Sequence, residues 1–437
     1  MEKTELSNKY RKKRYGGKTP AFIRLCVLLL IPSFLFASCN QSQSPVTGIK
    51  PTVKKTQMHN IAVESTSLEG MGHKYNYKLL YIAKNGKLYL KESEIEVFWN
   101  YEADRWELSE NNARTVEISA TGTDNTSVFI NKGKIFVIKS NGTLWQLHEA
   151  PDTKQYSAEQ VEVIERCVKV CVGKDSVTAL TSDGLVYSWG SNDHGQLGDG
   201  TFDDRETPAL VPGLSEISDI SGIWNHYMAL DKTGNVYTWG SNSFGKIGDG
   251  TYTQYDVIRD EDYYDSEDSE DSEDIIINSE IDYTKIVVNN DRNSVYRVEG
   301  LSGVVQISAG AAWSIVLLDD GTVFEWGGSK YVLHMPDPYD TKPKQLTSID
   351  GITMIAAGKG IAFALSDKGD LWTWRYIEHM YGIAGIGGDS KPYKLGFQAK
   401  IKEIIPDDFS IIVTQNNKIW MGQPGKDYYN EVFMRIQ

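Results

Sequence analysis

The sequence predicts an all-β fold, a β-propeller of seven similar blades, and three observations support this. First, "VYSWGSNDHGQLGDGT" (residues 186–201) recurs almost unchanged as "VYTWGSNSFGKIGDGT" (residues 236–251). Second, two apolar runs separated by a short break precede the turn in most copies. Third, a tight turn followed by alternating apolar and aromatic residues occurs seven times, at Gly86, Gly142, Gly184, Gly234, Gly321, Gly369 and Asn417. Two hairpins in each unit of about fifty residues correspond to one propeller blade.

One step between turns is longer than the others. The steps are 56, 42, 50, 87, 48 and 48 residues, so we expect an insertion at residues 254–290. It contains "DEDYYDSEDSEDSEDIIINSEID" (residues 260–282), whose repeated Ser-Glu-Asp has too little apolar surface to drive packing. We expect a solvated loop. The alternative, calcium or cationic-partner capture, lacks the spaced D-x-[DN]-x-[DN]-G pattern of a calcium loop.

The glycines of the two strongest copies have a structural interpretation. A phosphate-binding loop would need a Lys-Ser/Thr pair after its last glycine, and neither copy has one. We expect the glycines to turn the chain towards the next blade, with Leu197 and Ile247 filling the gap between sheets. Asn192 and Asn242 suit left-handed backbone positions. The aromatic residues of the strands are expected in the core between blades, and stacking on sugars is the alternative.

At these positions the chain resembles the RCC1 (regulator of chromosome condensation) repeat family, whose units read G-x-V/L-aromatic-x-W-G-x-N-x-x-G-x-L-G-x-G. The resemblance implies a seven-bladed propeller of RCC1 type over residues 72–437. The repeat at Gly369 keeps Trp374 but has Arg375 in place of the next glycine. Of the family's G-x-x-H signature only His226 is at the expected place, and the glycine there is Ile223. Two repeats carry the signature almost in full, at Trp189, Gly190, Asn192, Gly195, Gly198 and Gly200, and at Trp239, Gly240, Asn242, Gly245, Gly248 and Gly250.

The amino terminus resembles a bacterial lipoprotein signal. A basic stretch precedes a twelve-residue apolar run (residues 25–36), which is followed by "ASC". The resemblance implies cleavage after residue 38, lipidation of Cys39 and anchoring on the extracytoplasmic face of the bacterial cell membrane. Residues 39–71 are polar and contain proline, which indicates a flexible tether. An uncleaved transmembrane anchor is the alternative, although spanning a bilayer takes about 20 residues.

Charge and cysteine content narrow the possible partners. The formal charge is −14, and without residues 1–38, which hold eight basic and two acidic residues, it becomes about −20. Such a chain repels phosphate backbones, so we expect no nucleic-acid partner. Cys167 and Cys171 lie four residues apart on a predicted strand, about 13 Å by the strand rise. We therefore expect buried thiols; a disulfide is the alternative.

No catalytic motif is recognisable in the sequence. The seven histidines are scattered without H-E-x-x-H or metal spacing, and no G-x-S-x-G occurs. We therefore expect a non-enzymatic, monomeric protein without cofactor or metal, which binds an unknown protein partner at one rim of the propeller. The alternatives are a cell-envelope carbohydrate-binding or hydrolytic propeller and guanine-nucleotide exchange, the activity associated with the family. An exported chain would not meet a cytosolic GTPase, which argues against the exchange activity.

Overall fold

The structure is a computed structural model in which residues 50–437 belong to one compact unit. The described residues are 61–67, 74–100, 105–255, 286–329, 339–374, 391–397, 400–406, 410–414, 418–423 and 432–435. The predicted signal segment (residues 1–38) and Cys39 lie outside these ranges.

Six antiparallel four-stranded sheets have the dimensions of propeller blades, with strands of 3 to 7 residues. Blade I consists of β5 (Asn125–Asn131), β6 (Lys134–Lys139), β7 (Leu144–Glu149) and β8 (Tyr156–Gln160). Blade II consists of β9 (Cys167–Val172), β10 (Ser176–Thr181), β11 (Val186–Gly190) and β12 (Arg205–Leu210). Blade III consists of β13 (Ile217–Ile223), β14 (His226–Asp231), β15 (Val236–Gly240) and β18 (Arg292–Arg297). Blade IV consists of β19 (Val304–Ala309), β20 (Trp313–Leu318), β21 (Val323–Ser329) and β22 (Tyr339–Gln345). Blade V consists of β23 (Ile352–Ala357), β24 (Ala362–Ser366), β25 (Leu371–Trp374) and β26 (Tyr393–Leu395). Blade VI consists of β27 (Ile401–Ile405), β28 (Ser410–Thr414), β29 (Ile419–Gln423) and β30 (Val432–Arg435).

The predicted count of seven blades is wrong, because the first sheet is not a blade of this kind. It comprises β1 (Ile61–Ser67), β2 (Lys74–Ile82), β3 (Leu88–Asn100) and β4 (Arg105–Ile118), followed by the 3-10 helix η1 (Ser119–Thr121). β3 and β4 are 13 and 14 residues long, about twice the length of a blade strand. No glycine or proline occurs between residues 87 and 118 to end these strands, so the hairpin that begins at Gly86 continues.

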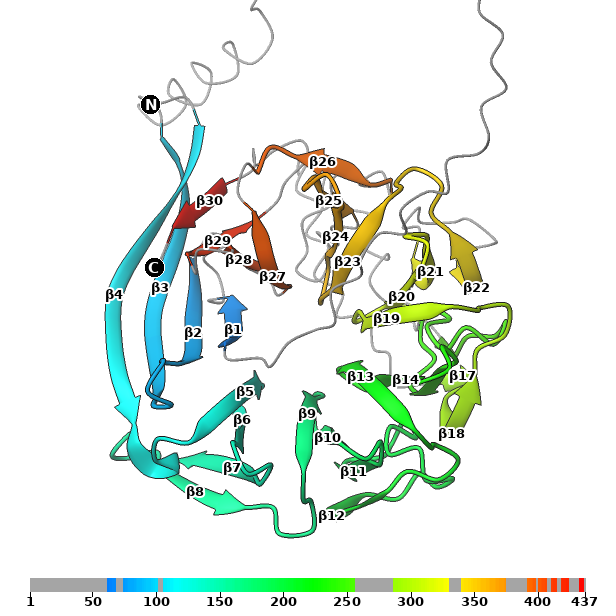
Figure 1. The fold of residues 1–437 in the computed structure, drawn as a ribbon, viewed down its shortest axis with the longest axis horizontal. Helices are drawn as coiled ribbons and strands as arrows, with labels where there is room; N and C mark the ends of the chain where they lie inside the picture. Colours follow the sequence, from blue (N-terminus) through cyan, green and yellow to red (C-terminus); the bar gives the residue numbers. More distant parts are fainter. Residues whose placement is uncertain are drawn as a thin grey trace, which may run out of the picture. The chain divides into compact units, whose positions relative to one another are not determined.

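The six blades and the first sheet follow one another in a ring (Figure 1), and the inner strands of this ring enclose a channel. The first sheet contacts blade I through β1 and β2, and contacts β30 of blade VI through β4. The channel has a volume of about 1260 Å³ and is lined by β1 and by the first strand of each blade. Near the end of the chain, β30 pairs with β29 as the outer strand of blade VI.

The predicted hairpin turns are confirmed wherever they are described. Each lies between the second and third strands of its sheet, and Asn417 is outside the described residues. The turn glycines have left-handed backbones: Gly86, Gly142, Gly184, Gly234, Gly321 and Gly369 have φ values between 76° and 88°. This conformation is accessible to glycine at little cost and explains the Asx-Gly or Lys-Gly pairs that recur at the turns.

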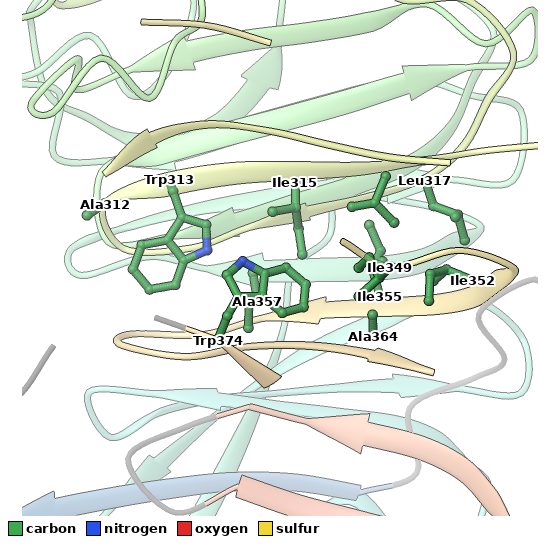
Figure 2. Close-up of a cluster of buried hydrophobic side chains, with 12 residues drawn as sticks. Ala312, Trp313, Ile315, Leu317, Ile349, Ile352, Ile355, Ala357, Ala364 and Trp374 are labelled. Atoms are coloured by element: carbon green, nitrogen blue, oxygen red, sulfur yellow. The ribbon is translucent and has the colours of Figure 1, made fainter. Parts of the chain in front are cut away.

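The hydrophobic core consists of layers between neighbouring sheets, one of which is drawn in Figure 2. In that layer Trp313 and Ile315 of blade IV face Trp374 and Ile355 of blade V, and all four side chains are buried. Comparable layers join the other successive blades and join the first sheet to blade I. The prediction that the signature tryptophans are core residues is therefore confirmed for Trp189, Trp239, Trp326 and Trp374.

Polar side chains on the inner strands join neighbouring sheets directly. The pair Lys169 Nζ–Asp219 Oδ1 (2.6 Å) joins blades II and III, and Gln306 exchanges two hydrogen bonds with the Ile355 backbone, joining blades IV and V. The remaining described links are Gly133 N to Glu64, Asn131 Nδ2 to the Val172 carbonyl, Ala309 N to Ser221 Oγ and Ala357 N to Ser308 Oγ. From the first sheet to blade V, these bonds fix the position of one inner strand relative to the next along the channel.

One predicted boundary differs from the structure. β1 begins at Ile61, inside the range 39–71 expected to be a tether, because "IAVESTS" pairs in register with β2. The predicted insertion at residues 254–290 begins and ends in a small ladder, in which β16 (Gln254–Tyr255) pairs with β17 (Ile286–Val288). Residues 256–285, including the Ser-Glu-Asp repeats, lie outside the described residues.

Candidate binding face

The signature repeats form loops on one edge of the propeller. In each blade the loops from first to second strand and from third to fourth strand reach the same edge, because the strands are antiparallel and consecutive in the sheet. We call this edge the loop face. The signature loops are residues 191–204 between β11 and β12 of blade II, and residues 241–291, which include the insertion, between β15 and β18 of blade III.

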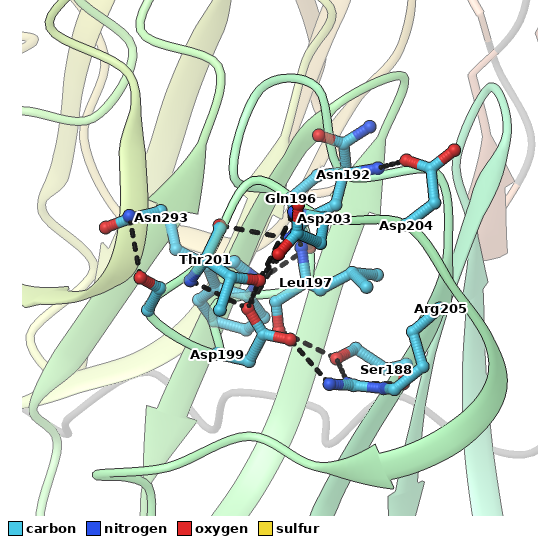
Figure 3. A network of polar contacts seen from close by, with 12 residues as sticks. Ser188, Asn192, Gln196, Leu197, Asp199, Thr201, Asp203, Asp204, Arg205 and Asn293 are labelled. Carbon is cyan, nitrogen blue, oxygen red and sulfur yellow. Dashed lines mark hydrogen bonds and ion pairs between the residues drawn. The ribbon is translucent and has the colours of Figure 1, made fainter.

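Asn192 organises the loop of blade II (Figure 3). Its Oδ1 accepts a hydrogen bond from Leu197 N (2.9 Å), and its Nδ2 donates to the carbonyl and hydroxyl oxygens of Thr201. Its backbone N–H donates to Asp204 Oδ1 (2.7 Å). The expectation that Asn192 and Asn242 adopt left-handed backbones is wrong, because neither has a positive φ. Asparagine is needed for its amide, which donates and accepts simultaneously.

Asp199 links the end of the same loop to β12. It accepts hydrogen bonds from the backbone and hydroxyl of Thr201 (3.0 and 2.7 Å) and forms an ion pair with Arg205. The Arg205 guanidinium also donates to the Ser188 carbonyl on β11 (3.1 Å). Burial would raise the pKa of Asp199, but the hydrogen bonds from Thr201 and the charge of Arg205 outweigh burial and hold the pKa below its usual value.

Blade III repeats this network despite its insertion. Asn242 Oδ1 accepts from Ile247 N (3.1 Å), and Asp249 is paired with Arg292 as Asp199 is with Arg205. The carboxylate that accepts from the Asn242 backbone is Asp291 (2.7 Å), 49 residues further along the chain. The corresponding separation in blade II is 12 residues. The insertion therefore lies within the loop and leaves its network intact.

Asp291 connects the loops of two blades and the base of the insertion. Its Oδ1 accepts from Asn242 N and from the Thr253 hydroxyl, and its Oδ2 lies 2.7 Å from Nδ1 of His194 in the blade II loop. The Asp291 side chain has no solvent exposure. Three strong donors to one buried carboxylate make it a rigid anchor.

The loop of each signature blade also covers the tryptophan of the next blade. Trp239 Nε1 donates to the Gln196 carbonyl (3.0 Å), and Trp326 Nε1 donates to the Lys246 carbonyl (2.8 Å). Gly248 has φ +85°, and a Cβ there would lie 2.7 Å from Trp326 Nε1. The glycine is required both by its backbone conformation and by this close approach.

A buried polar cluster lies beneath the blade III loop. His226 Nε2 is 2.7 Å from Ser314 Oγ, and that hydroxyl donates to the Lys246 carbonyl (2.9 Å). Burial, followed by the nearby Lys246 charge, lowers the pKa of His226 well below its usual value. Lys246 Nζ donates to the Ala311 carbonyl (3.1 Å), and burial lowers the pKa of this ammonium group to about 8. The cluster holds blades III and IV together and is closed to solvent.

Other predicted residues are found as follows. Cys167 and Cys171 are free and buried, and burial raises the pKa of both thiols to about 12. Leu197 and Ile247 are fully buried, as expected. Among the described residues no cluster of His, Cys, Asp or Glu could hold a metal ion, and no described helix has the length and apolar character to cross a bilayer.

Sequence reasoning missed the arginine and carboxylate that complete each loop. Asp204 and Arg205 in blade II, and Asp291 and Arg292 in blade III, were not singled out. The available signal is the Asp-Arg pair, which follows "GDGT" after two residues in one repeat and follows the insertion in the other. Only the common network shows that these two pairs are equivalent.

Comparison with known proteins supports the repeat assignment. Family models described as "Regulator of chromosome condensation (RCC1) repeat" match residues 183–230, and residues 167–196 and 217–246. These matches cover the signature loop of blade II and the first residues, 241–246, of the signature loop of blade III. The matches identify RCC1 repeats within residues 167–246. The matched residues belong to blades II and III.

Two groups of curated proteins are similar in sequence. The E3 ubiquitin-protein ligase HERC2 of Mus musculus is 28% identical over 273 residues, 56% of this chain and 6% of that protein. Alsin of Rattus norvegicus is 43% identical over 68 residues, 14% of this chain and 4% of that protein. The chain therefore spans only a small fraction of the length of these relatives.

Solved structures show the same fold. Prp20p from Saccharomyces cerevisiae has a TM-score of 0.54 at 17% identity, covering 89% of this chain and 88% of its own. Human WBSCR16 has a TM-score of 0.53 at 15% identity, covering 84% and 92%. At these identities the likeness establishes the β-propeller fold.

Proposed function

We propose that the protein is a non-enzymatic interaction scaffold that binds a protein partner through its loop face. The observation that carries the proposal is the duplicated network of blades II and III, which braces the loop face and holds both ends of a long insertion. A rigid framework carrying a variable loop is the usual arrangement of a protein-binding surface. The RCC1 repeats and the propeller fold support it.

The chemistry of the loop face favours binding over catalysis. Asp199, Asp249 and Asp291 are occupied by hydrogen bonds or ion pairs within the loops, and His226 is buried against Ser314. A general acid or base needs access to substrate and a pKa near the working pH. These groups hold loops in place instead.

The proposed partner is a basic protein. The formal charge of the chain is −14, and the Ser-Glu-Asp repeats at residues 266–274 are its densest run of charge. Charge of this kind mainly increases the association rate and the salt dependence of binding. Binding to a neutral protein would gain little from it.

The experiment compares two forms of the full-length protein, solubilised in detergent and immobilised. In one, "SEDSEDSED" is replaced by a neutral Gly/Ser linker of equal length. Captured proteins are identified, and their association rates are measured at two salt concentrations. We expect a basic partner whose association slows in the variant and becomes less salt-dependent. A partner that associates at the same rate with both forms, or an enzymatic activity abolished by a single carboxylate substitution, would contradict the proposal.

We also propose that the scaffold is anchored by lipid on Cys39 at the extracytoplasmic face of a bacterial membrane. The lipobox-like "LFASC" supports this. We expect Cys39→Ala to leave the protein unprocessed or to release it from the membrane fraction. Normal cleavage with unchanged membrane partition would refute the anchor.

A further inference from the structure

A polar cleft of about 670 Å³ lies between the first sheet and blade I, in addition to the core layer that joins them. Its walls come from β2, β3 and β4 on one side and from the loops after β5 and β7 on the other. It belongs to the part of the chain that departs from the RCC1 pattern, so the signature repeats do not account for it. Four cationic residues line it: Lys78, Arg114, Lys132 and Lys154.

A β-bulge shapes the wall formed by the first sheet. The pairing of β3 with β4 shifts register between Glu92, opposite Arg114, and Glu94, opposite Asn111. Asn112, next to the shift, has a left-handed backbone (φ +54°). A bulge bends its strand and redirects the neighbouring side chains, and bulges are frequent beside binding sites.

The wall formed by blade I presents two lysines from unusual backbone positions. Lys132, between β5 and β6, has φ +50°, and Lys154, between β7 and β8, has φ +54°. Glycine or asparagine would occupy such positions with less strain. Asn131 holds the first of these turns, donating through Nδ2 to the carbonyls of Val172 and Gly173 (2.8 and 3.0 Å).

Three carboxylates also line the cleft: Glu64, Glu92 and Glu94. Glu92, opposite Arg114 in the first sheet, lies 3.7 Å from Lys78 Nζ. Glu64 accepts from Gly133 N (3.1 Å), and Glu94 accepts from Asn112 Nδ2 (3.1 Å). Glu149 is shared by Lys78 and Lys154, at 3.6 and 3.3 Å.

Two of the four cations that line the cleft have no ion pair within the described part of the chain. Among the described residues no carboxylate forms an ion pair with Arg114 or Lys132. Burial, followed by the Glu149 charge, raises the pKa of Tyr156 in blade I, and the Arg114 charge opposes this rise. The charge of Glu92, opposite Arg114 in the first sheet, acts on the same pKa in the other direction.

We propose that this cleft binds a small polyvalent anion, a phosphate or a polycarboxylate, between Arg114 of the first sheet and Lys132 of blade I. A guanidinium offers paired donors that match carboxylate and phosphate oxygens, and a lysine adds a second charge from the opposite wall. The residues that line the cleft carry four positive and three negative charges, a formal charge of +1 in a chain of charge −14, and two of the four cations have no ion pair with a described residue, which favours an anion. The bound anion would link the first sheet to blade I.

The test measures binding of inorganic phosphate and of citrate to the full-length protein by isothermal titration calorimetry. Ionic strength is held constant with sodium chloride. The variants are Arg114→Gln and Lys132→Asn, because asparagine tolerates the left-handed backbone of residue 132. The matched control is Lys174→Asn, in the corresponding loop of blade II and outside the cleft.

We expect one of the two anions to bind with one-to-one stoichiometry, and its affinity to fall at least tenfold in each cleft variant and to be unchanged in Lys174→Asn. Thermal melting of every variant without ligand checks that the fold is intact. Absence of saturable binding by either anion overturns the proposal. So does an equal loss in the control variant, which would indicate attraction by net charge rather than a site.

Discussion

At the scale of single residues, Lys246 is the most unusual member of the signature loops. In blade II the same position is Gln196, whose amide bonds within its own loop. Lys246 is buried, and its ammonium group has one hydrogen bond, to the Ala311 carbonyl. Burial of a charge with so few partners costs stability, and this cost appears as the lowered pKa.

Lys246→Gln is predicted to stabilise the protein at pH 7. The folded-state pKa of about 8 lies below the usual 10.5, so the folded protein binds the proton less tightly than the unfolded chain. The loss of folding stability caused by burying the Lys246 charge is therefore complete below pH 8 and disappears as the pH rises towards 10.5. By linkage it amounts to at most about 3 kcal/mol. Chemical denaturation at pH 7 and pH 10 measures it.

The reverse substitution in blade II, Gln196→Lys, is the matched control and should destabilise the protein at pH 7. A Lys246→Gln variant that is less stable than the parent at pH 7, or equally more stable at both pH values, would contradict this account of the buried lysine.

At the scale of elements, the two signature loops show how an insertion can be accommodated. Asn242, Asp249 and Arg292 repeat the contacts of Asn192, Asp199 and Arg205. The added residues start and finish at the β16–β17 ladder, next to Asp291. The blade therefore keeps its outer strand, β18, in place although the preceding loop is much longer.

Asp291→Asn is predicted to destabilise the protein by about 2 kcal/mol or more. The substitution removes a charge that accepts hydrogen bonds from Asn242, Thr253 and His194, and hydrogen bonds to a charged group contribute about 1.5–3 kcal/mol each. Urea denaturation measures the change. Asp203→Asn, an exposed carboxylate on the same face, should have an effect below about 0.5 kcal/mol. Equal effects of the two substitutions would show that Asp291 is not an anchor.

At the scale of the whole molecule, stability depends on contacts between successive sheets. Every layer of the core lies between two sheets, and inner-strand side chains link each sheet to the next from the first sheet to blade V. Contacts between β30 and β4 join the last blade to the first sheet. This contact between the last and the first sheets closes the ring.

Deletion of residues 431–437 is predicted to lower the melting temperature substantially. It removes β30, which leaves the edge of β29 unpaired and abolishes the contact with β4. A loss of several kilocalories per mole corresponds to a fall well beyond about 2 °C for a domain of this size. Differential scanning calorimetry measures it. A variant that melts within about 2 °C of the parent would show that the outer strand contributes little to closure.

The sequence alone determined the blade architecture, because a blade is a local structure. Turns such as Asp183-Gly184 and Asn141-Gly142, and the apolar strands around them, specify hairpins from residues that are close in the chain. The buried tryptophans and the two signature loops could be predicted for the same reason. The extent of β3 and β4 could not be, because the seven turns mark where hairpins begin and not how far their strands run.

Only the tertiary structure decided which distant residues meet. Asp291 takes the place of Asp204 because the two ends of a long insertion meet at one point in the fold. The sequence does not show that these ends meet, because they are far apart along the chain. Arg114 and Lys132 face one cleft because the first sheet packs on blade I. Periodicity specifies hairpins, whereas contacts between sheets depend on the packing of surfaces that the chain brings together only when it folds.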